Sequence, residues 1–326
     1  MRHHYLGSAF AAYIALAPAF DCGAETQRVP NIGYQFRNHL ALAALRYFGG
    51  LRKRLMGRFG TAILARSENG LLLVPAQDVF VGRHLCFQGS YDREILAFLL
   101  SQCNDESAVL VVGAHVGAFA IPLAKKSRSV AAVEANPATC ELLKMNALLN
   151  AVPHMEVYNF AAGDGNEDVP FLVSTQNTGG SKIRMGEWNR KAYVYDQPDT
   201  VTVPMKRLDD AFPGQSFDLI IMDIEGSEAL ALAGMPDLLS RCNGLVVEIV
   251  DHHLNRIARV TNEQFLSLVT PYFDEAIILP DGHRRLGAVS SAPYSKCAFG
   301  ELMSVCREHD VANVLFRRAS AAHPHE

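Results

Sequence analysis

The stretch VLVVGAHVGAFAI, residues 109–121, decides the fold class of this chain. It begins as an apolar run, turns through two glycines and becomes apolar again, which is typical of a buried strand leading into a helix. Gly113 can adopt the positive φ that a sharp strand-to-helix turn requires, and Gly117 lets the helix approach the strand closely. The free N–H groups of the new helix would face a ligand at the end of the strand. Alone, the stretch fits a ligand loop and a tight corner in a core equally well.

The alternation of apolar and amphipathic segments continues from residue 91 onwards. It predicts an α/β protein with a doubly wound, mostly parallel, Rossmann-like sheet. The polar, glycine-containing residues 163–204 predict hairpins. Ligands of such sheets bind beyond the carboxyl ends of the strands, so we searched those ends for candidate residues. The expected strands are 108–112, 129–134, 155–161, 218–223, 244–250, 274–279 and 311–316, and the expected helices are 91–103, 116–126, 137–150, 227–240 and 261–271.

Composition and charge limit the classes of protein that this chain can represent. Its 326 residues, 49% of them hydrophobic, can form one large domain with extensions. A net charge of −4 gives no indication of a nucleic-acid partner. The seven cysteines are odd in number, are scattered, and show no zinc-ligand spacing. We therefore expect a reduced, cytoplasmic protein with buried thiols and no metal site.

Three regions are expected along the chain. Residues 1–70 would form an N-terminal helical extension, residues 71–317 the main domain and residues 318–326 a disordered tail. The first 20 residues resemble a weak signal peptide, but Pro18 interrupts the apolar run and an amphipathic or poorly ordered extension is favoured. Residues 34–60 predict a basic helix that could associate weakly with an anionic membrane. Basic residues on a helix more often form a face that is only exposed to solvent. The oligomeric state is left open.

The ends of the second and third predicted strands carry the first candidates. Glu134 follows the glycine turn by about 20 residues, the distance at which a strand-end carboxylate accepts hydrogen bonds from ribose hydroxyls. Small residues at 160–165, including Ala162 and Asp164, could leave room for a flat ring or could form only a turn.

The end of the fourth predicted strand, MDIEGSEALALAG at residues 222–234, carries three acids. Glu228 fits the first turn of a helix, where the dipole favours negative charge. Asp223 and Glu225 directly follow an apolar strand, where carboxylates are costly unless they meet a partner or solvent in a cleft. A structural network of acids is the alternative. After the fifth strand, His252 and His253 lie near further acids, but this tandem spacing is poor for one metal site.

Together these segments resemble a class I S-adenosylmethionine-dependent methyltransferase, and more narrowly the FkbM-type methyltransferases. The resemblance spans about residues 88–317. It implies a seven-stranded sheet whose last strand is antiparallel, with the methyl donor lying across the first three strands. The segments that carry it are GSYDREI, VVGAHVGAF, VEANP, the helix with Asn146 and Asn150, NTGGS at 177–181, LDD at 208–210 and FDLIIMDIEGSEALALAGM.

The resemblance also implies roles for individual residues. Glu134 would hold the ribose, the turn at 113–117 the methionine part of S-adenosylmethionine, and the turn at 161–164 the adenine. We expect O-methylation of a hydroxyl on a small molecule or a glycan sugar, for which alignment and a base near the acceptor are needed. The candidates to orient or deprotonate the acceptor are Asp223, Glu225 and His252. The cofactor-binding candidates are Gly113, Ala114, His115, Gly117, Glu134, Asn136, Ala162, Asp164 and Asp223.

The turn departs from the family pattern at two positions, and two other functions are considered. Val111 stands where the family usually has Asp, and His115 stands where it usually has Asn. Val111 is the main argument for a non-catalytic binding protein on the same fold. A nicotinamide-dependent oxidoreductase would also use a glycine turn and an acid, but His115 occupies the middle glycine position of its GxGxxG fingerprint.

Overall fold

A computed structural model describes residues 57, 59–185, 196, 198–250, 253–279, 295–308 and 311–318. The expectations for the N-terminal 56 residues and for the tail after residue 318 lie outside the described residues, as does the candidate His252. Within the described part, no helix combines the length and the apolar character that crossing a bilayer requires.

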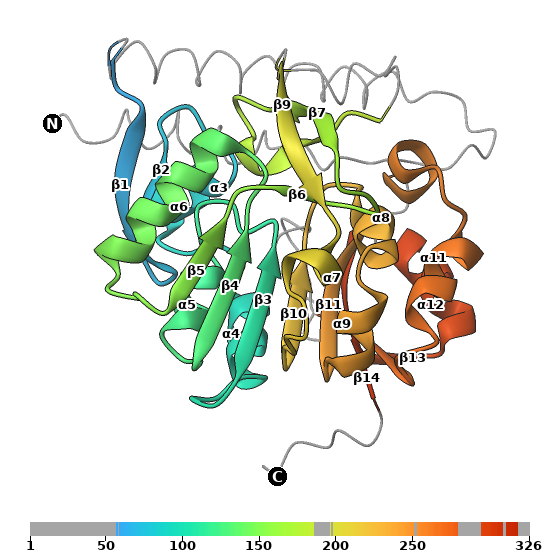
Figure 1. The fold of residues 1–326 in the computed structure, drawn as a ribbon. Helices are drawn as coiled ribbons and strands as arrows, with labels where there is room; N and C mark the ends of the chain where they lie inside the picture. The colour runs from blue at the N-terminus through green and yellow to red at the C-terminus, as the bar shows by residue number, and fades with distance from the viewer. Residues whose placement is uncertain are drawn as a thin grey trace, which may run out of the picture.

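The centre of the fold is a sheet of eight strands in the order β13-β12-β14-β11-β10-β3-β4-β5 (Figure 1). From β5 to β11 the neighbouring strands are parallel, and β14 is antiparallel to both β11 and β12. The predicted Rossmann-like sheet with an antiparallel last strand is confirmed. The strands are β3 (Ala108–Val112), β4 (Ser129–Val133), β5 (Met155–Tyr158), β10 (Leu219–Met222), β11 (Gly244–Val250), β12 (Glu275–Ile278), β13 (Ser295–Cys297) and β14 (Val311–Arg317).

Strand β13 is an addition to the seven strands that were expected. It has three residues and pairs only with β12, at the edge of the sheet. Three residues are too few to show the alternation by which a strand is found in a sequence. The edge strand therefore changes the strand count without changing the topology of the seven others.

Helices cover both faces of the sheet, and each face has its own hydrophobic core. Successive residues of β3 point to opposite faces, so Val112 belongs to one core and Val111 to the other. The predicted helix 227–240 is two helices, because Pro236 begins a new one. The helices are α4 (Arg93–Ser101), α5 (Ala120–Ala124), α6 (Pro137–Leu149), α7 (Leu208–Ala211), α8 (Glu228–Ala233), α9 (Pro236–Arg241), α11 (Asn262–Val269) and α12 (Phe299–Glu308).

An N-terminal hairpin, β1 (Ala62–Ser67) and β2 (Gly70–Pro75), is attached to α6 by two side-chain amides. Asn146 accepts from the N–H of Leu73 at 2.6 Å and donates to its carbonyl at 3.0 Å. Asn150 makes the same pair of bonds with Leu71, at 3.1 and 2.8 Å. The hairpin lies across the boundary expected at residue 70, so the described domain includes β1.

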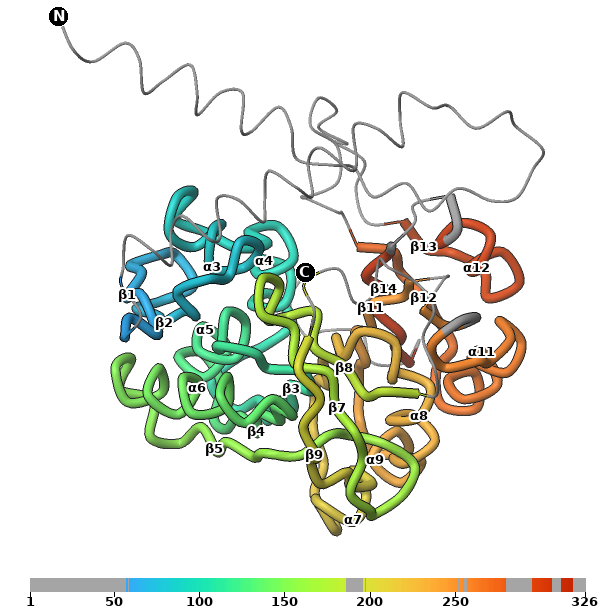
Figure 2. Tube along the Cα trace, turned by 90° about the horizontal axis from the view of Figure 1, so that it is seen from above, coloured from blue at the N-terminus to red at the C-terminus, as the bar shows by residue number. Residues whose placement is uncertain are grey.

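A second, small sheet lies above the carboxyl ends of the parallel strands (Figure 1). Its order is β6 (Ala161–Ala162), β9 (Asp199–Lys206), β7 (Asp168–Val173) and β8 (Lys182–Ile183). The antiparallel pairing of β7 with β9 agrees with the hairpins predicted for this region. Figure 2 shows these strands running between the β3–β5 half of the molecule and the β10–β11 half. The space beneath them is therefore bounded by both halves.

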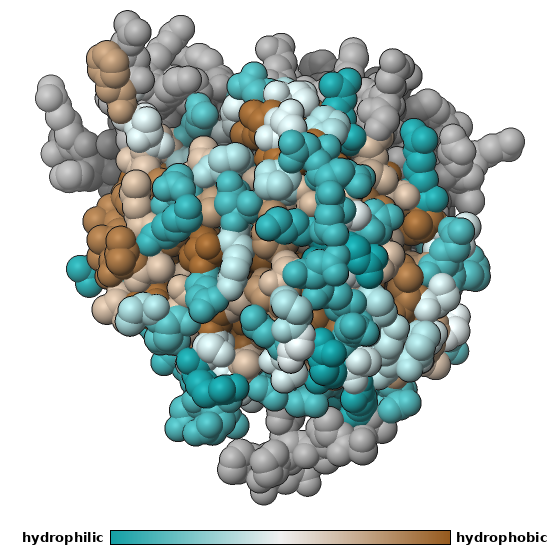
Figure 3. All heavy atoms as spheres, in the orientation of Figure 1, coloured by the Kyte–Doolittle hydropathy of each residue, from teal (hydrophilic) through white to brown (hydrophobic). Residues whose placement is uncertain are grey.

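Exposed apolar side chains gather at the carboxyl end of α6. In Figure 3 a brown area lies at the left edge of the view, on the side where α6 ends. Met145, Leu148 and Leu149 are exposed there, with Leu148 at 81%. Leu143 of the same helix is buried in the core, so this end of α6 is apolar toward solvent as well as toward the core.

Candidate functional site

A cleft of about 490 Å³, partly open to solvent, lies between the carboxyl ends of β3, β4 and β10 and the small sheet. This is the edge at which a parallel sheet binds its ligands. Five of the residues predicted from sequence line it, namely Gly113, His115, Glu134, Ala162 and Asp223.

The glycine turn brings the ends of β3 and β10 into contact. Gly113 has φ +85°, and a Cβ at this position would lie 1.9 Å from the carbonyl oxygen of Asp223. Glycine is therefore required both by the backbone angle and by the space. Gly117, at φ +93°, does not line the cleft, and a Cβ there would lie 2.8 Å from Leu143 Cδ1 on α6. Ala114 is buried and donates its N–H to the carbonyl of Val133 at 2.9 Å.

Glu134 is buried at the end of β4, and its carboxylate fixes two loops. One oxygen accepts from the N–H of His115 at 2.8 Å, and the other accepts from the N–H of Asn136 at 2.8 Å. Burial raises the pKa of Glu134 to about 7, although the two N–H groups oppose the shift. Each oxygen retains a second acceptor position, which a hydroxyl in the cleft could use.

Asn136 and Asp164 lie outside the lining of the cleft. The side chain of Asn136 accepts from the N–H of Ala138 at 3.1 Å, so it is the N-cap of α6. Asp164 is exposed, and its backbone carbonyl accepts from Arg207 at 3.3 Å. The third strand end contributes Phe160 and two alanines to the lining, so the flat part of a ligand would meet small apolar groups there.

Val111 lies in the hydrophobic core and not in the cleft. Only 2% of it is exposed, and it packs in the cluster that contains Val109 and Ile121. The next residue, Val112, is the one that lines the cleft. The valine at position 111 therefore does not replace an acid in the lining of the cleft.

Asp223 lies between the cleft and a second, smaller hollow. It lines both, and Asp92, Phe119, Glu248 and Asn313 are also in the wall of the second hollow. Burial, followed by the negative charges of nearby acids, raises the pKa of Asp223 to about 8, while a hydrogen bond with Glu248 opposes the shift. Burial and the neighbouring acids therefore both favour the protonated form of Asp223.

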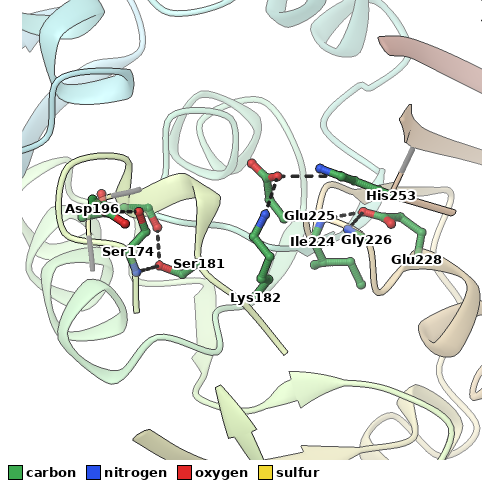
Figure 4. A network of polar contacts seen from close by, with 10 residues as sticks. Ser174, Ser181, Lys182, Asp196, Ile224, Glu225, Gly226, Glu228 and His253 are labelled. Atoms are coloured by element: carbon green, nitrogen blue, oxygen red, sulfur yellow. Dashed lines mark hydrogen bonds and ion pairs between the residues drawn. The ribbon is translucent and has the colours of Figure 1, made fainter. Parts of the chain in front are cut away.

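The two other acids of residues 222–234, Glu225 and Glu228, are not in the lining of the cleft, and Figure 4 shows their contacts. Glu225 has φ +56°, and its Oε2 lies 3.5 Å from Lys182 Nζ and 3.8 Å from His253 Nδ1. This contact joins β8 of the small sheet to the end of β10. Glu228 accepts from the N–H groups of Ile224 and Gly226, both at 3.1 Å, so it shapes the loop. Burial raises the pKa of Glu228 to about 6, with these N–H groups opposing.

Three polar residues that line the cleft, Thr178, Ser181 and Ser227, were not singled out from the sequence. The buried hydroxyl of Ser227 lines the cleft and has no hydrogen-bond partner, so a ligand could supply one. Thr178, in the NTGGS segment, also lines the cleft and its Oγ1 lies 2.7 Å from His115 Nε2. Together with Glu134, these groups fit a ligand that carries hydroxyl and amino groups. In the described ranges, no three His, Cys, Asp or Glu side chains are grouped as metal ligands would be.

Three solved structures illustrate what this chain is similar to. Trm5b from Pyrococcus abyssi is 16% identical with a TM-score of 0.41, and the match covers 80% of this chain and 57% of that one. Methyltransferase FkbM from Methylobacillus flagellatus KT is 15% identical with a TM-score of 0.40, covering 95% and 59%. M. jannaschii TYW2 in complex with AdoMet is 14% identical with a TM-score of 0.40, covering 79% and 87%. This chain thus spans less than two thirds of the first two.

A search of curated protein sequences returned no match. A family match is present: residues 112–279, more than half of the chain, match the methyltransferase FkbM domain. The matched range begins at the end of β3 and ends after β12, so it contains the glycine turn, Glu134, the small sheet and the DIEG segment. The chain belongs to the FkbM methyltransferase family.

Proposed function

We propose that this protein transfers a methyl group from S-adenosylmethionine to a hydroxyl oxygen of a small molecule or glycan sugar in the cytoplasm. When bound, S-adenosylmethionine supplies an electrophilic methyl group on its sulfonium sulfur. The observation that carries the proposal is the position of Asp223, which lines both the cleft and the second hollow. A donor in the one and an acceptor in the other would meet at this carboxyl group.

The residues of the cleft suit the parts of the donor. Glu134 has acceptor positions left for the ribose hydroxyls, in addition to those that hold the loops. Phe160 and Ala162 provide apolar surface for the adenine. Ser227 offers a hydroxyl to a polar group of the donor.

The wall of the second hollow carries groups that can hydrogen-bond to a hydroxyl. It combines an aromatic ring, that of Phe119, with Asp92, Glu248 and the amide of Asn313. Carboxylates accept hydrogen bonds from hydroxyl groups but repel phosphates, which disfavours a nucleic acid as acceptor. In its carboxylate form, Asp223 would accept the proton of the attacking hydroxyl.

The non-catalytic alternative rests on Val111, and that side chain lies in the hydrophobic core and not in the lining of the cleft.

A donor-dependent assay tests the proposal. The full chain is incubated with S-adenosylmethionine and a panel of hydroxylated acceptors, namely sugars, glycosides and small alcohols, and the products are analysed by mass for the gain of a methyl group. We expect a gain that needs both the donor and the protein. Calorimetric titrations with the donor and with NADH accompany the assay. No methyl gain with any acceptor, together with no donor binding, would overturn the proposal.

A further inference from the structure

A chain of hydrogen bonds runs from the N-terminal part of the domain into the cleft, and it begins at Asp78. Asp78 is completely buried between β2 and α3 (Val81–Arg83). Its Oδ1 accepts from the N–H groups of Phe80 and Gly82, both at 2.9 Å. Its Oδ2 accepts from the N–H of Thr178 at 3.0 Å and from the Thr178 hydroxyl. Four N–H and O–H donors therefore point at this one carboxyl group, which acts as the acceptor in each of these bonds.

The direction of the next hydrogen bond follows from this. Because the Thr178 hydroxyl donates its only proton to Asp78, it offers only lone pairs to His115. The contact of 2.7 Å between Thr178 Oγ1 and His115 Nε2 therefore requires a proton on Nε2. Burial lowers the pKa of His115, with the charge of Asp78 opposing, so the ring is neutral. A neutral imidazole protonated at Nε2 has a lone pair at Nδ1.

The Nδ1 atom is available to a ligand. No hydrogen bond in the described part of the chain uses it, and His115 lines the cleft at the glycine turn. The residue is held in two places, because its backbone N–H donates to Glu134 and its Nε2 donates to Thr178. An asparagine at this position could present either an oxygen or an N–H group to a ligand. His115, held in this way, presents only an acceptor.

We propose that Asp78 and Thr178 orient His115 so that its Nδ1 accepts a hydrogen bond from the ammonium group of the methionine part of the methyl donor. This inference rests on the proposed function, since it assigns a residue to the donor. The methionine part carries an ammonium group and a carboxylate, and an acceptor can bind only the first. His115 is then a binding residue, while Thr178 and Asp78 are positioning residues.

The test compares two ligands by calorimetry. S-adenosylhomocysteine has the amino acid part, and methylthioadenosine lacks it. We expect His115→Phe to weaken the binding of S-adenosylhomocysteine by about 10-fold to 100-fold, the usual range for a hydrogen bond to a charged group, and to leave methylthioadenosine unchanged. Thr178→Val, which keeps the shape but removes the hydroxyl, should weaken S-adenosylhomocysteine alone, by a smaller factor. The control is His154→Gln, since His154 bonds to the carbonyl of Ala124 and does not line the cleft.

Nitrogen NMR of the ligand-free protein gives a readout that does not depend on the donor. We expect the His115 signals, assigned by their loss in His115→Phe, to show a proton at Nε2, and we expect Thr178→Val to change them. An equal loss of affinity for both ligands, or a proton at Nδ1, would overturn the inference. If the wild-type protein bound neither ligand, the proposed function would fail first, and this inference with it.

Discussion

Glu134 and Asp223 each follow a buried parallel strand and line the same cleft, yet their surroundings differ in kind. Glu134 has two backbone N–H donors, each at 2.8 Å. Burial first, and then the charges of Glu225, Glu228 and Asp92, raise the pKa of Asp223 to about 8. Backbone donors fix a carboxylate in place, whereas neighbouring acids make it retain a proton. The first arrangement suits a group that holds a ligand, and the second suits a group whose charge changes during a reaction.

The largest effect is expected when an acid is placed inside a strand and not at its end. Val111→Asp would bury a carboxyl in the core, where Val111 is 2% exposed. We expect a loss of roughly 4 kcal/mol or more in the free energy of unfolding, measured by denaturant titration. Val111→Ala, which adds no polar group, is the matched control, and its free energy of unfolding should fall by less. A folded Val111→Asp protein that binds the donor more tightly would instead mean that position 111 serves the cleft.

The next largest effect concerns the acid with acidic neighbours. We expect Asp223→Asn to lower turnover by about 100-fold to 10,000-fold, the usual contribution of a general base, while thermal stability is kept. Asp164→Asn is the control, because Asp164 is exposed and outside the lining of the cleft. Equal turnover in Asp223→Asn and wild type would remove Asp223 from the mechanism.

The pH dependence of the rate sharpens the contrast between the two strand ends. If the carboxylate form of Asp223 is needed, kcat/KM rises with pH and levels above a pKa of about 8. The rise below that value is about tenfold per pH unit for a single group. A profile that is flat between pH 6 and 9, at unchanged protein stability, would contradict this assignment.

Stability should have the opposite pH dependence. The pKa values of Glu134 and Asp223, about 7 and about 8, lie above those of carboxyl groups in an unfolded chain. Between about pH 4 and pH 8 the folded state therefore binds more protons, and its stability falls as pH rises. We expect a fall of roughly 1 kcal/mol per pH unit per group, measured by denaturant titration. In Asp223→Asn the fall should be shallower, and an unchanged slope would count against the raised pKa.

The smallest effect is expected at the acid with backbone donors. Glu134→Gln keeps one acceptor oxygen but turns an NH₂ group toward a backbone N–H, which costs about 1 to 3 kcal/mol. We expect donor binding about tenfold weaker by calorimetry and an unchanged kcat at saturating donor. A large loss of kcat with unchanged affinity would mean that Glu134, like Asp223, takes part in the chemical step.

The sequence contained enough to place the backbone of the cleft. Strand β3 has the predicted bounds, because a strand buried on both faces is a continuous apolar run. The spacing between the glycine turn and Glu134 predicted that Glu134 lies at the cleft, which the structure confirms. Like the bounds of β3, this spacing can be read from one continuous segment of the sequence. The roles assigned to these residues stay predictions until they are tested.

Contacts between distant segments could not be predicted. Thr178 reaches His115 across 63 residues because the small sheet folds back over the strand ends, and no periodicity records such a return. Asp223 and Glu225 look equivalent in sequence, but the positive φ of Glu225 turns its side chain toward Lys182. The hairpin of β1 and β2 does have a local signal, since Asn69 and Gly70 are turn residues between two apolar runs, and the sequence analysis missed it. Its attachment to Asn146 and Asn150 could not be predicted, because in the sequence these are two polar residues of a helix.

The contact between Gly113 and the carbonyl of Asp223 has a consequence for the evolution of this chain. Every single-base change in a glycine codon that alters the amino acid introduces a Cβ, and at this position the Cβ would lie 1.9 Å from that oxygen. Every single substitution of Gly113 therefore creates this steric clash. Descendants of this gene will retain glycine here for as long as the two strand ends meet.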